Sequence, residues 1–353
     1  MSMKHYIYIT LAIVLSIVTA CTEHPIDQGP QVPESSRSYI FFEPEVLEAK
    51  TTKAEIVEGE ELPGDASTAF GVLGYYEGTS IFKGYGDGIA EVYRREKNSS
   101  FQYDHLGWWL IRDAAATTKH NFFAFYPYSI NENNENVVPN NGNPYINYTL
   151  PTSEADMEDI LTAYKSTARV SPVQIVFQHR LWALDLEVVN SQTGDGYSQP
   201  GAEITPPNLT VVSAKVTLDN IPSKGTMGIS DLTYTINSRT TQAYTLPQTD
   251  ITISPVDDPV TTGIKENAAC FGPLLFLPTD VSYDGGTVGY KLDFTFKNHW
   301  GDEYTQSFDR SFKLAKFEPG KRYKLTIVKN DTEATVGLTV SEWTTQDVTH
   351  TFE

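Results

Sequence analysis

The sequence predicts an all-β protein built from antiparallel β-sandwiches, and three observations support this. Tyrosine and phenylalanine are frequent, with 20 and 17 residues, and both favour strands. Short apolar runs either alternate with polar residues or are rich in β-branched residues, as half-buried and buried strands are. Gly, Pro, Asn and Asp separate these runs, and no amphipathic helices lie between them, which argues against a parallel sheet with crossover helices.

Length and composition narrow the choice further. The 353 residues exceed what one ordinary domain needs and predict two domains. A hydrophobic content of 40% is enough for real cores and argues against global disorder. The net charge of −19 would repel phosphate backbones, which excludes nucleic acid as a partner. Two cysteines, Cys21 and Cys270, cannot make a disulfide-stapled fold or a cysteine-based zinc site.

The first twenty residues predict an export signal. A short polar start containing Lys4 precedes the apolar run 7–18, which is too short to span a bilayer stably. The small residues that end at Ala20 stand directly before Cys21, an arrangement that resembles the bacterial lipobox. The resemblance implies a diacylglycerol and an acyl chain such as palmitate on Cys21, which would anchor the protein durably. An ordinary secretory signal that ends near a cysteine is the alternative.

The mature chain divides into a tether and two folded parts. Residues 21–38 contain three prolines and many polar residues, which predicts an extended tether. A boundary is expected at Ser171-Pro172, because the residue before proline is pushed into an extended conformation and a long strand follows. We therefore expect β-sandwich domains over residues 39–171 and 172–353. Cys270, in an apolar run, is expected to be a buried and inert thiol.

Each expected strand is an alternating, β-branched or aromatic run bounded by turn residues. The stretches Asn131–Asn143 and Asn220–Pro222 predict loops or turns, and Ser153–Asp156 predicts a short capped helix. The expected strands of the first half are 39–43, 68–76, 90–94, 101–103, 108–111, 121–126 and 159–163. Those of the second half are 173–189, 209–218, 231–236, 242–245, 270–277, 287–296, 304–308, 323–328, 336–340 and 348–352.

The sequence carries no recognisable catalytic or cofactor motif. There is no GxSxG, HExxH or GxxxxGK[ST] pattern, and the seven histidines are scattered without chelating spacing. His179, on an expected strand, is interpreted as a partly buried structural residue. Glu154, Asp156, Glu158 and Asp159 are interpreted as a solvated face, whereas a glycosidase would need two carboxylates facing one pocket. We expect no catalytic residues, no metal and no cofactor.

Aromatic clusters suggest a second class of function. Trp108-Trp109, Trp300 and Tyr304 could stack on sugars if they are exposed. Adjacent residues of a strand face opposite sides, so at least one residue of the tryptophan pair is expected in the core. A surface glycan-binding lipoprotein is therefore the alternative function.

Several segments together resemble one protein family, the fimbrillins of Bacteroidetes, Mfa-like lipoproteins that build or accompany type V pili. The resemblance covers essentially the whole mature chain, and its parts stand in order behind the lipobox. Each segment alone is degenerate. The segments are TTKA at 51–54, FGVLGYY at 70–76, NFFAFYP at 121–127, VFQHRL at 176–181, CFGPL at 270–274 and VSEW at 340–343.

The resemblance implies a fold, a location and partners. It implies two transthyretin-like β-sandwich domains in tandem and export to the outer membrane and cell surface. It also implies assembly with other fimbrial subunits, self or heterotypic, and a host or bacterial surface receptor for an adhesive subunit. In such proteins a protease removes an N-terminal strand after a basic residue, and the vacated groove accepts a strand from the neighbouring subunit.

The removable strand is expected within Ser38–Leu47, where Tyr39, Ile40, Phe41 and Phe42 are its leading residues. Donor-strand exchange works by β-augmentation, in which backbone hydrogen bonds give affinity and alternate side chains fill pockets. The strand must therefore be extended and must precede the cleavage site.

Lys50 and Lys53 follow that strand and are the candidate cleavage sites, with solvated loop lysines as the alternative interpretation. Arg37 precedes the strand, so a cut there would release the lipid without opening a groove. Polymerising members of the family are often cut after arginine, whereas only lysines follow the strand here. The protein could therefore also be an uncleaved anchor or accessory subunit, and this role is kept as an alternative.

A donor strand must be extended, alternating and near a terminus. The C-terminal segments 335–340 and 347–352 have that character. The candidate donor residues are Val336, Leu338, Val340 and Val348.

Overall fold

The computed structural model confirms the all-β class. In the part of the chain that the structure describes, the regular structure consists of strands and two short 3-10 helices, η2 (Tyr128–Asn134) and η3 (Glu154–Asp156). Within the described residues no helix is long and apolar enough to cross a membrane. All described residues belong to one compact unit, Ile40–Glu353. The structure describes residues 40–46, 69–76, 78–82, 88–93, 102–103, 119–134, 136–140, 143–168, 172–192, 207–246, 250–255, 268–280, 287–298, 300–330, 333–342 and 351–352.

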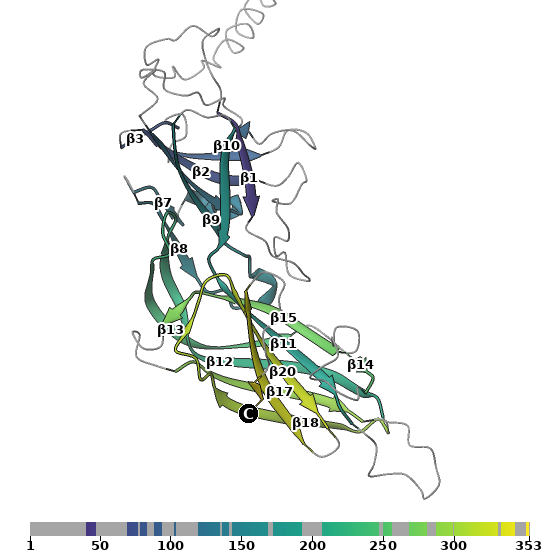
Figure 1. Ribbon diagram of the computed structural model, residues 1–353. Coiled ribbons are helices and arrows are strands. Elements are labelled where there is room, and N and C mark those ends of the chain that lie inside the picture. The colour runs from purple at the N-terminus through teal and green to yellow at the C-terminus, as the bar shows by residue number, and fades with distance from the viewer. Residues whose placement is uncertain are drawn as a thin grey trace, which may run out of the picture. The chain divides into compact units, whose positions relative to one another are not determined.

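The first sheet contains eight strands in the order β1-β10-β9-β6-β2-β4-β5, with β3 paired to β2 (Figure 1). Strand β1 runs parallel to β10, and every other described pairing in this sheet is antiparallel. The strands are β1 (Phe42–Val46), β2 (Ala69–Tyr76), β3 (Thr79–Ser80), β4 (Ile89–Tyr93), β5 (Gln102–Tyr103), β6 (His120–Tyr126), β9 (Leu161–Thr167) and β10 (Val173–His179).

Two further sheets are built mostly from the second half of the chain, with β7 and β8 contributed by the first half. One has the order β15-β11-β20-β21-β22, and the other has the order β18-β17-β12-β8-β7, with β13 and β14 paired to β12. A short pair, β16 with β19, completes the described strands. Their bounds are β7 (Val137–Val138), β8 (Tyr145–Thr149), β11 (Trp182–Asn190), β12 (Leu209–Gly228), β13 (Tyr234–Leu246), β14 (Ile251–Ile253), β15 (Ala268–Phe276), β16 (Thr279–Asp280), β17 (Gly289–Lys297), β18 (Glu303–Ser311), β19 (Lys316–Phe317), β20 (Lys321–Lys329), β21 (Ala334–Glu342) and β22 (Thr351–Phe352).

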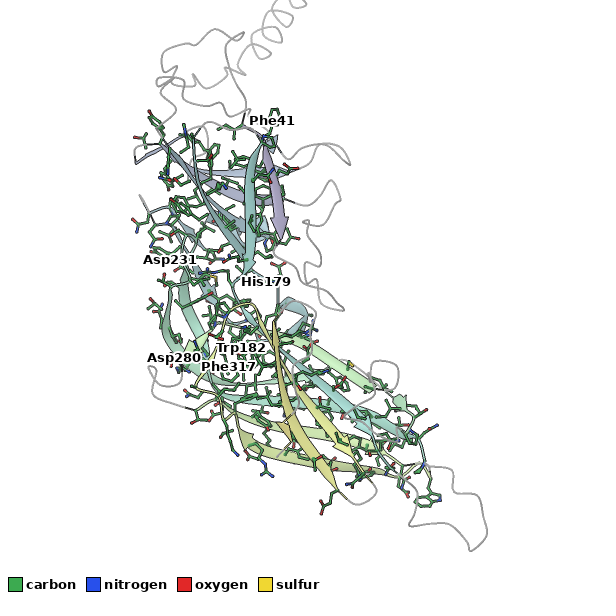
Figure 2. All side chains as sticks on the ribbon, in the orientation of Figure 1. Phe41, His179, Trp182, Asp231, Asp280 and Phe317 are labelled. Atoms are coloured by element: carbon green, nitrogen blue, oxygen red, sulfur yellow. The ribbon has the colours of Figure 1, made fainter. Side chains whose placement is uncertain are left out.

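The larger core lies where the five-stranded and seven-stranded sheets pack face to face. Many of its buried residues come from β11, β15 and β20 on one side and from β12 and β17 on the other, and the cluster continues into the eight-stranded sheet through residues of β2 and β6. Trp182 lies within it, stacked on Phe317 with ring centroids 4.5 Å apart, and its indole N–H donates to the Leu277 carbonyl at 2.9 Å (Figure 2). A buried tryptophan whose polar atom is satisfied is what a packed sandwich core requires.

A smaller core lies on one face of the eight-stranded sheet. Phe70 on β2 contacts Phe177 on β10 at 5.5 Å between ring centroids, although β6 and β9 separate these strands in the sheet order. The sheet must therefore curl, so that distant strands share one apolar interior.

The segment 173–189, predicted as one strand, forms two strands in different sheets. β10 alternates strictly between buried and exposed residues, as a strand with one covered face does, whereas nearly all of β11 is buried. The break falls at Arg180 and Leu181. The guanidinium of Arg180 donates to the carbonyls of Gly228 and Asp231 at 2.7 and 2.6 Å. These contacts are with residues about fifty positions away, so the local sequence pattern did not predict the break.

Of three other local predictions, two are wrong and one is confirmed. Asn220–Pro222 is not a turn but an irregularity inside β12, where the register with β13 shifts and Asn220 has a φ of 58°. The separate strands predicted at 231–236 and 242–245 are one strand, β13. The predicted cap at Ser153 is confirmed, because its hydroxyl accepts the N–H of Ala155 at 3.3 Å at the start of η3.

Sheet membership crosses the boundary expected at Ser171-Pro172. β10 follows it but pairs with β1 and β9, whereas β7 and β8 precede it and belong to the sheet of β12. The division into tandem domains over residues 39–171 and 172–353 stays a prediction.

Candidate functional site: edge strand β1 and its groove

Strand β1 lies at the edge of the eight-stranded sheet, and β10 is its ladder partner among the described strands (Figure 1). The register runs from Phe42 opposite Val173 to Val46 opposite Phe177. Ahead of the ladder, the Val173 N–H donates to the Phe41 carbonyl at 2.7 Å. An edge strand held along one side is the kind of element that can be replaced by a strand from another chain.

The inner face of β1 closes the smaller core. Ile40 is 2% exposed and Phe42 is fully buried. The Phe42 ring meets Phe70 and Phe122 edge to face, at centroid distances of 6.2 and 5.5 Å. Phe177 contacts Phe70 in turn. Removal of β1 would thus open an apolar groove floored by aromatic side chains of β2, β6 and β10.

The outer face of β1 is polar, and the strand carries a proline. Glu43 is exposed and its carboxylate accepts a hydrogen bond from the Gln174 side chain. Pro44 stands opposite Ile175, and because Phe41 accepts the Val173 N–H in this parallel ladder, the nitrogen of Pro44 faces the open edge and not β10. The strand is therefore held both by its ladder with β10 and by its buried apolar face.

The C-terminal strand that carries the candidate donor residues is part of a ladder in the structure. β21 pairs with β20 over nine residues and with β22 over two. Val336, Leu338 and Val340 are partly buried and pack on the larger core along one face of the strand. This alternation matches the apolar face of β1, where Ile40, Phe42 and Pro44 are buried.

Several predicted site residues lie outside the described part of the chain. They include the lipidation residue, the candidate cleavage sites, the first residue of the removable strand, the last candidate donor residue and the adjacent tryptophans. These are Cys21, Arg37, Lys50, Lys53, Tyr39, Val348, Trp108 and Trp109.

A buried polar pair connects β10 to the segment before β9. His179, which Figure 2 labels, has its Nδ1 2.7 Å from Asp159 Oδ2, and both side chains are almost fully buried. The expectation that Asp159 lies on a solvated face is therefore wrong. His179 was expected to be partly buried, and it is 6% exposed. Twenty residues separate the pair in sequence, and only the pairing of β9 with β10 brings them together.

Arg180 is a second buried polar residue that the sequence did not reveal. Its guanidinium holds the turn between β12 and β13 through Gly228 and Asp231, and it lies over the Tyr234 ring at 5.0 Å. The Tyr234 hydroxyl donates back to the Arg180 carbonyl at 2.9 Å. A run of β-branched and aromatic residues around Arg180 gave no signal for this role.

Cys270 is exposed, so the expectation of a buried thiol is wrong. On β15 its neighbours Ala269 and Phe271 point into the core, and strand alternation turns Cys270 outward. Partial burial, followed by the nearby Glu187 carboxylate, raises the pKa of the thiol. Among the described residues, no group of three His, Cys, Asp or Glu side chains could hold a metal ion.

The exposed aromatics predicted for the second half are present at the β17–β18 turn. Trp300 is 60% exposed and Tyr304 is 36% exposed. The Asn298 side-chain oxygen accepts the N–H groups of Trp300 and Asp302 at 3.0 and 2.9 Å, which fixes the turn. Gly301 adopts a φ of 92°, a conformation that favours glycine.

The fold is that of an all-β protein in which one edge strand, β1, covers an apolar groove. Comparison with known proteins gives the family. The family model described as fimbrillin-like matches residues 63–343. This match spans most of the sequence, and the chain belongs to the fimbrillin-like family. No curated protein matches the sequence.

Solved structures share the fold at low sequence identity. A fimbrial protein from Bacteroides vulgatus aligns with a TM-score of 0.53 and 19% identity, covering 78% of this chain and 93% of the other. A protein from Bacteroides uniformis, described as a putative cell adhesion protein, aligns with a TM-score of 0.50 and 16% identity, covering 89% and 100%. A protein from Bacteroides ovatus with the same description gives 0.50 and 17%, covering 88% and 100%.

Proposed function

We propose that the chain is a non-enzymatic fimbrial subunit, structural or adhesive, that assembles by donor-strand exchange. Membership of the fimbrillin-like family supports the fimbrial part, and the edge position of β1 over an apolar groove is the observation that supports exchange. Its partners would be other fimbrial subunits, self or heterotypic. An uncleaved anchor or accessory subunit, in which β1 stays in place, is the variant of this proposal.

Export and anchoring are part of the same proposal. Residues 1–20 would be a lipoprotein signal peptide, and lipid on Cys21 would carry the precursor to the outer membrane and cell surface. Cleavage after Lys50 or Lys53 would then separate β1 and its lipid from the rest of the chain. The tandem transthyretin-like arrangement belongs to this proposal as well.

The energetic argument for exchange rests on the inner face of β1. Without β1, the site of Phe42 opens to water, and burial of a phenylalanine contributes about 1.5–3 kcal/mol. The backbone groups of β10 that β1 satisfies would also lose their partners. An incoming strand with apolar residues at alternate positions restores both, which gives exchange its driving force.

The C-terminal strand β21 is the donor we propose. Val336, Leu338 and Val340 have the same period as Ile40, Phe42 and Pro44, so they can occupy the same row of sites. Because β21 pairs with β20 in the single chain, donation requires that it leave this ladder. Release costs the nine-residue ladder with β20, the half-buried apolar face and the burial of Thr339 on the other face, and the bonds that β21 makes with β10 of the next subunit would have to replace them.

Cysteine cross-linking tests the donor directly. In a Cys270→Ser background, each variant carries two introduced cysteines. One is Ile175→Cys in the groove, and the other is Val336→Cys, Leu338→Cys or Val340→Cys in the donor strand. Oxidised fibres should then show covalently linked subunits, since facing residues of paired strands have Cβ atoms about 4.5–5.5 Å apart. Cys at Thr339, on the opposite face of β21, is the matched control. Equal linkage through the control position, or none through the other three, would refute β21 as the donor.

Mass spectrometry of surface-extracted fibres tests cleavage. Subunits whose first residue follows Lys50 or Lys53 are expected if removal of β1 triggers assembly. Intact, acylated Cys21 in every assembled subunit would overturn cleavage as the trigger and leave the anchor or accessory role. Deletion of the gene with no change in fibres or adhesion would remove the assembly role altogether.

A surface glycan-binding lipoprotein is the second candidate, favoured by the exposure of Trp300 and Tyr304 on a fixed turn. Trp300→Ala with binding measured on a glycan array separates the two functions. A purely structural subunit should show no specific loss.

A further inference from the structure

A small pocket lies at the end of the eight-stranded sheet, apart from the β1 groove. Its volume is about 230 Å³, and its walls come from β9, β10 and the turn between β12 and β13. The polar residues that line it and enter the argument are Arg180, Asp231 and Gln178, and the apolar ones are Tyr164, Val176 and Leu232.

The arginine in the wall has a buried nitrogen without a described partner. Arg180 is 2% exposed, and its Nη2 donates to the carbonyls of Gly228 and Asp231. Its Nε is buried and makes no hydrogen bond to any described residue. A buried donor without a partner is costly, and an oxygen atom of a bound molecule would satisfy it if the side chains that cover Nε move aside on binding.

An acceptor lies in the same wall. The Asp231 carboxylate accepts the backbone N–H of Thr233 at 3.1 Å and also its hydroxyl (Figure 2). The hydroxyl of Thr233 is the main cause that lowers the pKa of Asp231, so the group is ionised at neutral pH. An ionised carboxylate opposes an anionic ligand and favours one with hydroxyl donors.

Apolar surface surrounds these polar groups. Tyr164, Val176 and Leu232 are 45%, 38% and 56% exposed, an unusual degree for large apolar side chains that lie together. The tyrosine is held in place, because its hydroxyl donates to the Asn121 side chain at 3.0 Å and its ring packs on Phe123 at 4.9 Å.

We infer that this pocket binds one neutral pyranose ring of a glycan. A sugar ring carries adjacent hydroxyls, which both donate and accept, and an apolar C–H face. Arg180, Asp231 and Gln178 supply the complementary polar groups, and Tyr164 supplies an aromatic surface. The volume is below the range of about 300–1,000 Å³ typical of clefts for larger ligands, which limits the site to a single ring.

This site deepens the adhesive part of the proposed function and does not depend on strand exchange. None of its lining residues belongs to β1 or β21. Failure of fibre assembly and failure of sugar binding can therefore be observed separately, since binding is measured on the purified chain and assembly on cells.

The test uses the purified full-length chain and a panel of methyl pyranosides of glucose, galactose, mannose, N-acetylglucosamine and glucuronic acid. Saturation-transfer NMR should show saturable binding of at least one neutral member. Tyr164→Ala and Gln178→Ala, both at exposed positions, should each weaken it at least ten-fold while the circular dichroism spectrum stays unchanged. Lys291→Ala, at an exposed position on β17 outside the pocket, is the matched control and should bind as the parent does. Trp300→Ala separates this pocket from the β17–β18 turn, which is the other candidate sugar site.

A glycan array with host mucin-type glycans and bacterial polysaccharides in separate arms then identifies the source of the ring. Absence of saturable binding to every neutral glycoside overturns the inference. Binding that survives both pocket variants, or that is lost in the Trp300→Ala chain instead, places the sugar elsewhere and also overturns it. Preference for the glucuronide would contradict the neutral class of ligand.

Discussion

Phe42 offers the sharpest test of how β1 is held. Its side chain is fully buried, and it makes edge-to-face contacts with Phe70 and Phe122. Burial of a phenylalanine contributes about 1.5–3 kcal/mol, and each such aromatic pair adds about 0.5–1.5 kcal/mol. Phe42→Ala should therefore lower the free energy of unfolding by about 3–5 kcal/mol, the usual range for this change in a core.

Urea denaturation measures the loss, with hydrogen exchange across β10 as a second readout. Glu43→Ala is the matched control, because Glu43 is the exposed neighbour on the same strand and should change stability by no more than about 0.5 kcal/mol. If the loss is confined to β1, the amides of β10 should lose protection before the rest of the sheet. A loss below about 1 kcal/mol with unchanged protection of β10 would refute the argument that Phe42 holds the strand in its groove.

Three other predictions concern single sites. Asp231 has a lowered pKa, chiefly through the Thr233 hydroxyl, so its stabilising contribution is present above the ordinary pKa of aspartate and is lost as pH falls through the lowered value. Asp231→Asn should flatten the acid limb of a stability–pH profile below about pH 4, and an unchanged limb would contradict the assignment. Gly71→Ala should destabilise the chain by about 1–3 kcal/mol, because a Cβ there would lie 2.0 Å from the Phe125 ring, and a neutral result in thermal unfolding would show that the ring can move. Cys270 is exposed but has a raised pKa, so a thiol reagent should label it slowly at pH 7 and faster as pH rises, whereas rapid labelling at pH 7 would count against the shift.

The sequence allowed most strands to be placed because their signals are local. The apolar, aromatic and β-branched runs 68–76, 121–126 and 323–328 correspond to β2, β6 and β20 within a few residues. The stretch Asn131–Asn143 was predicted to be a loop, which is wrong at Val137–Val138, because these residues form β7. β8, which follows it, was missed for the same reason. β8 pairs with β7 and with β12, a strand far along the chain. Local pattern cannot report such a partner.

In the segment 173–189 the local pattern failed to show where a strand ends. Its composition favours strand throughout, and only the contacts of Arg180 with Gly228 and Asp231 reveal that it divides between two sheets. Asp159 was placed on a solvated face for a similar reason, since its partner His179 lies twenty residues away. Cys270 was placed in the core because the apolar run around it does not show which face of the strand it occupies.

The all-β class and the fimbrillin-like family were therefore accessible from the sequence alone. Both depend on residue types and on their order along the chain. The edge position of β1, the groove beneath Phe42 and the pocket around Arg180 were decided by the tertiary structure. Each is made by side chains from strands distant in sequence, and a burial pattern does not state which strands will meet. The physical reason is that alternation determines which residues are buried, whereas strand pairing determines what they are buried against.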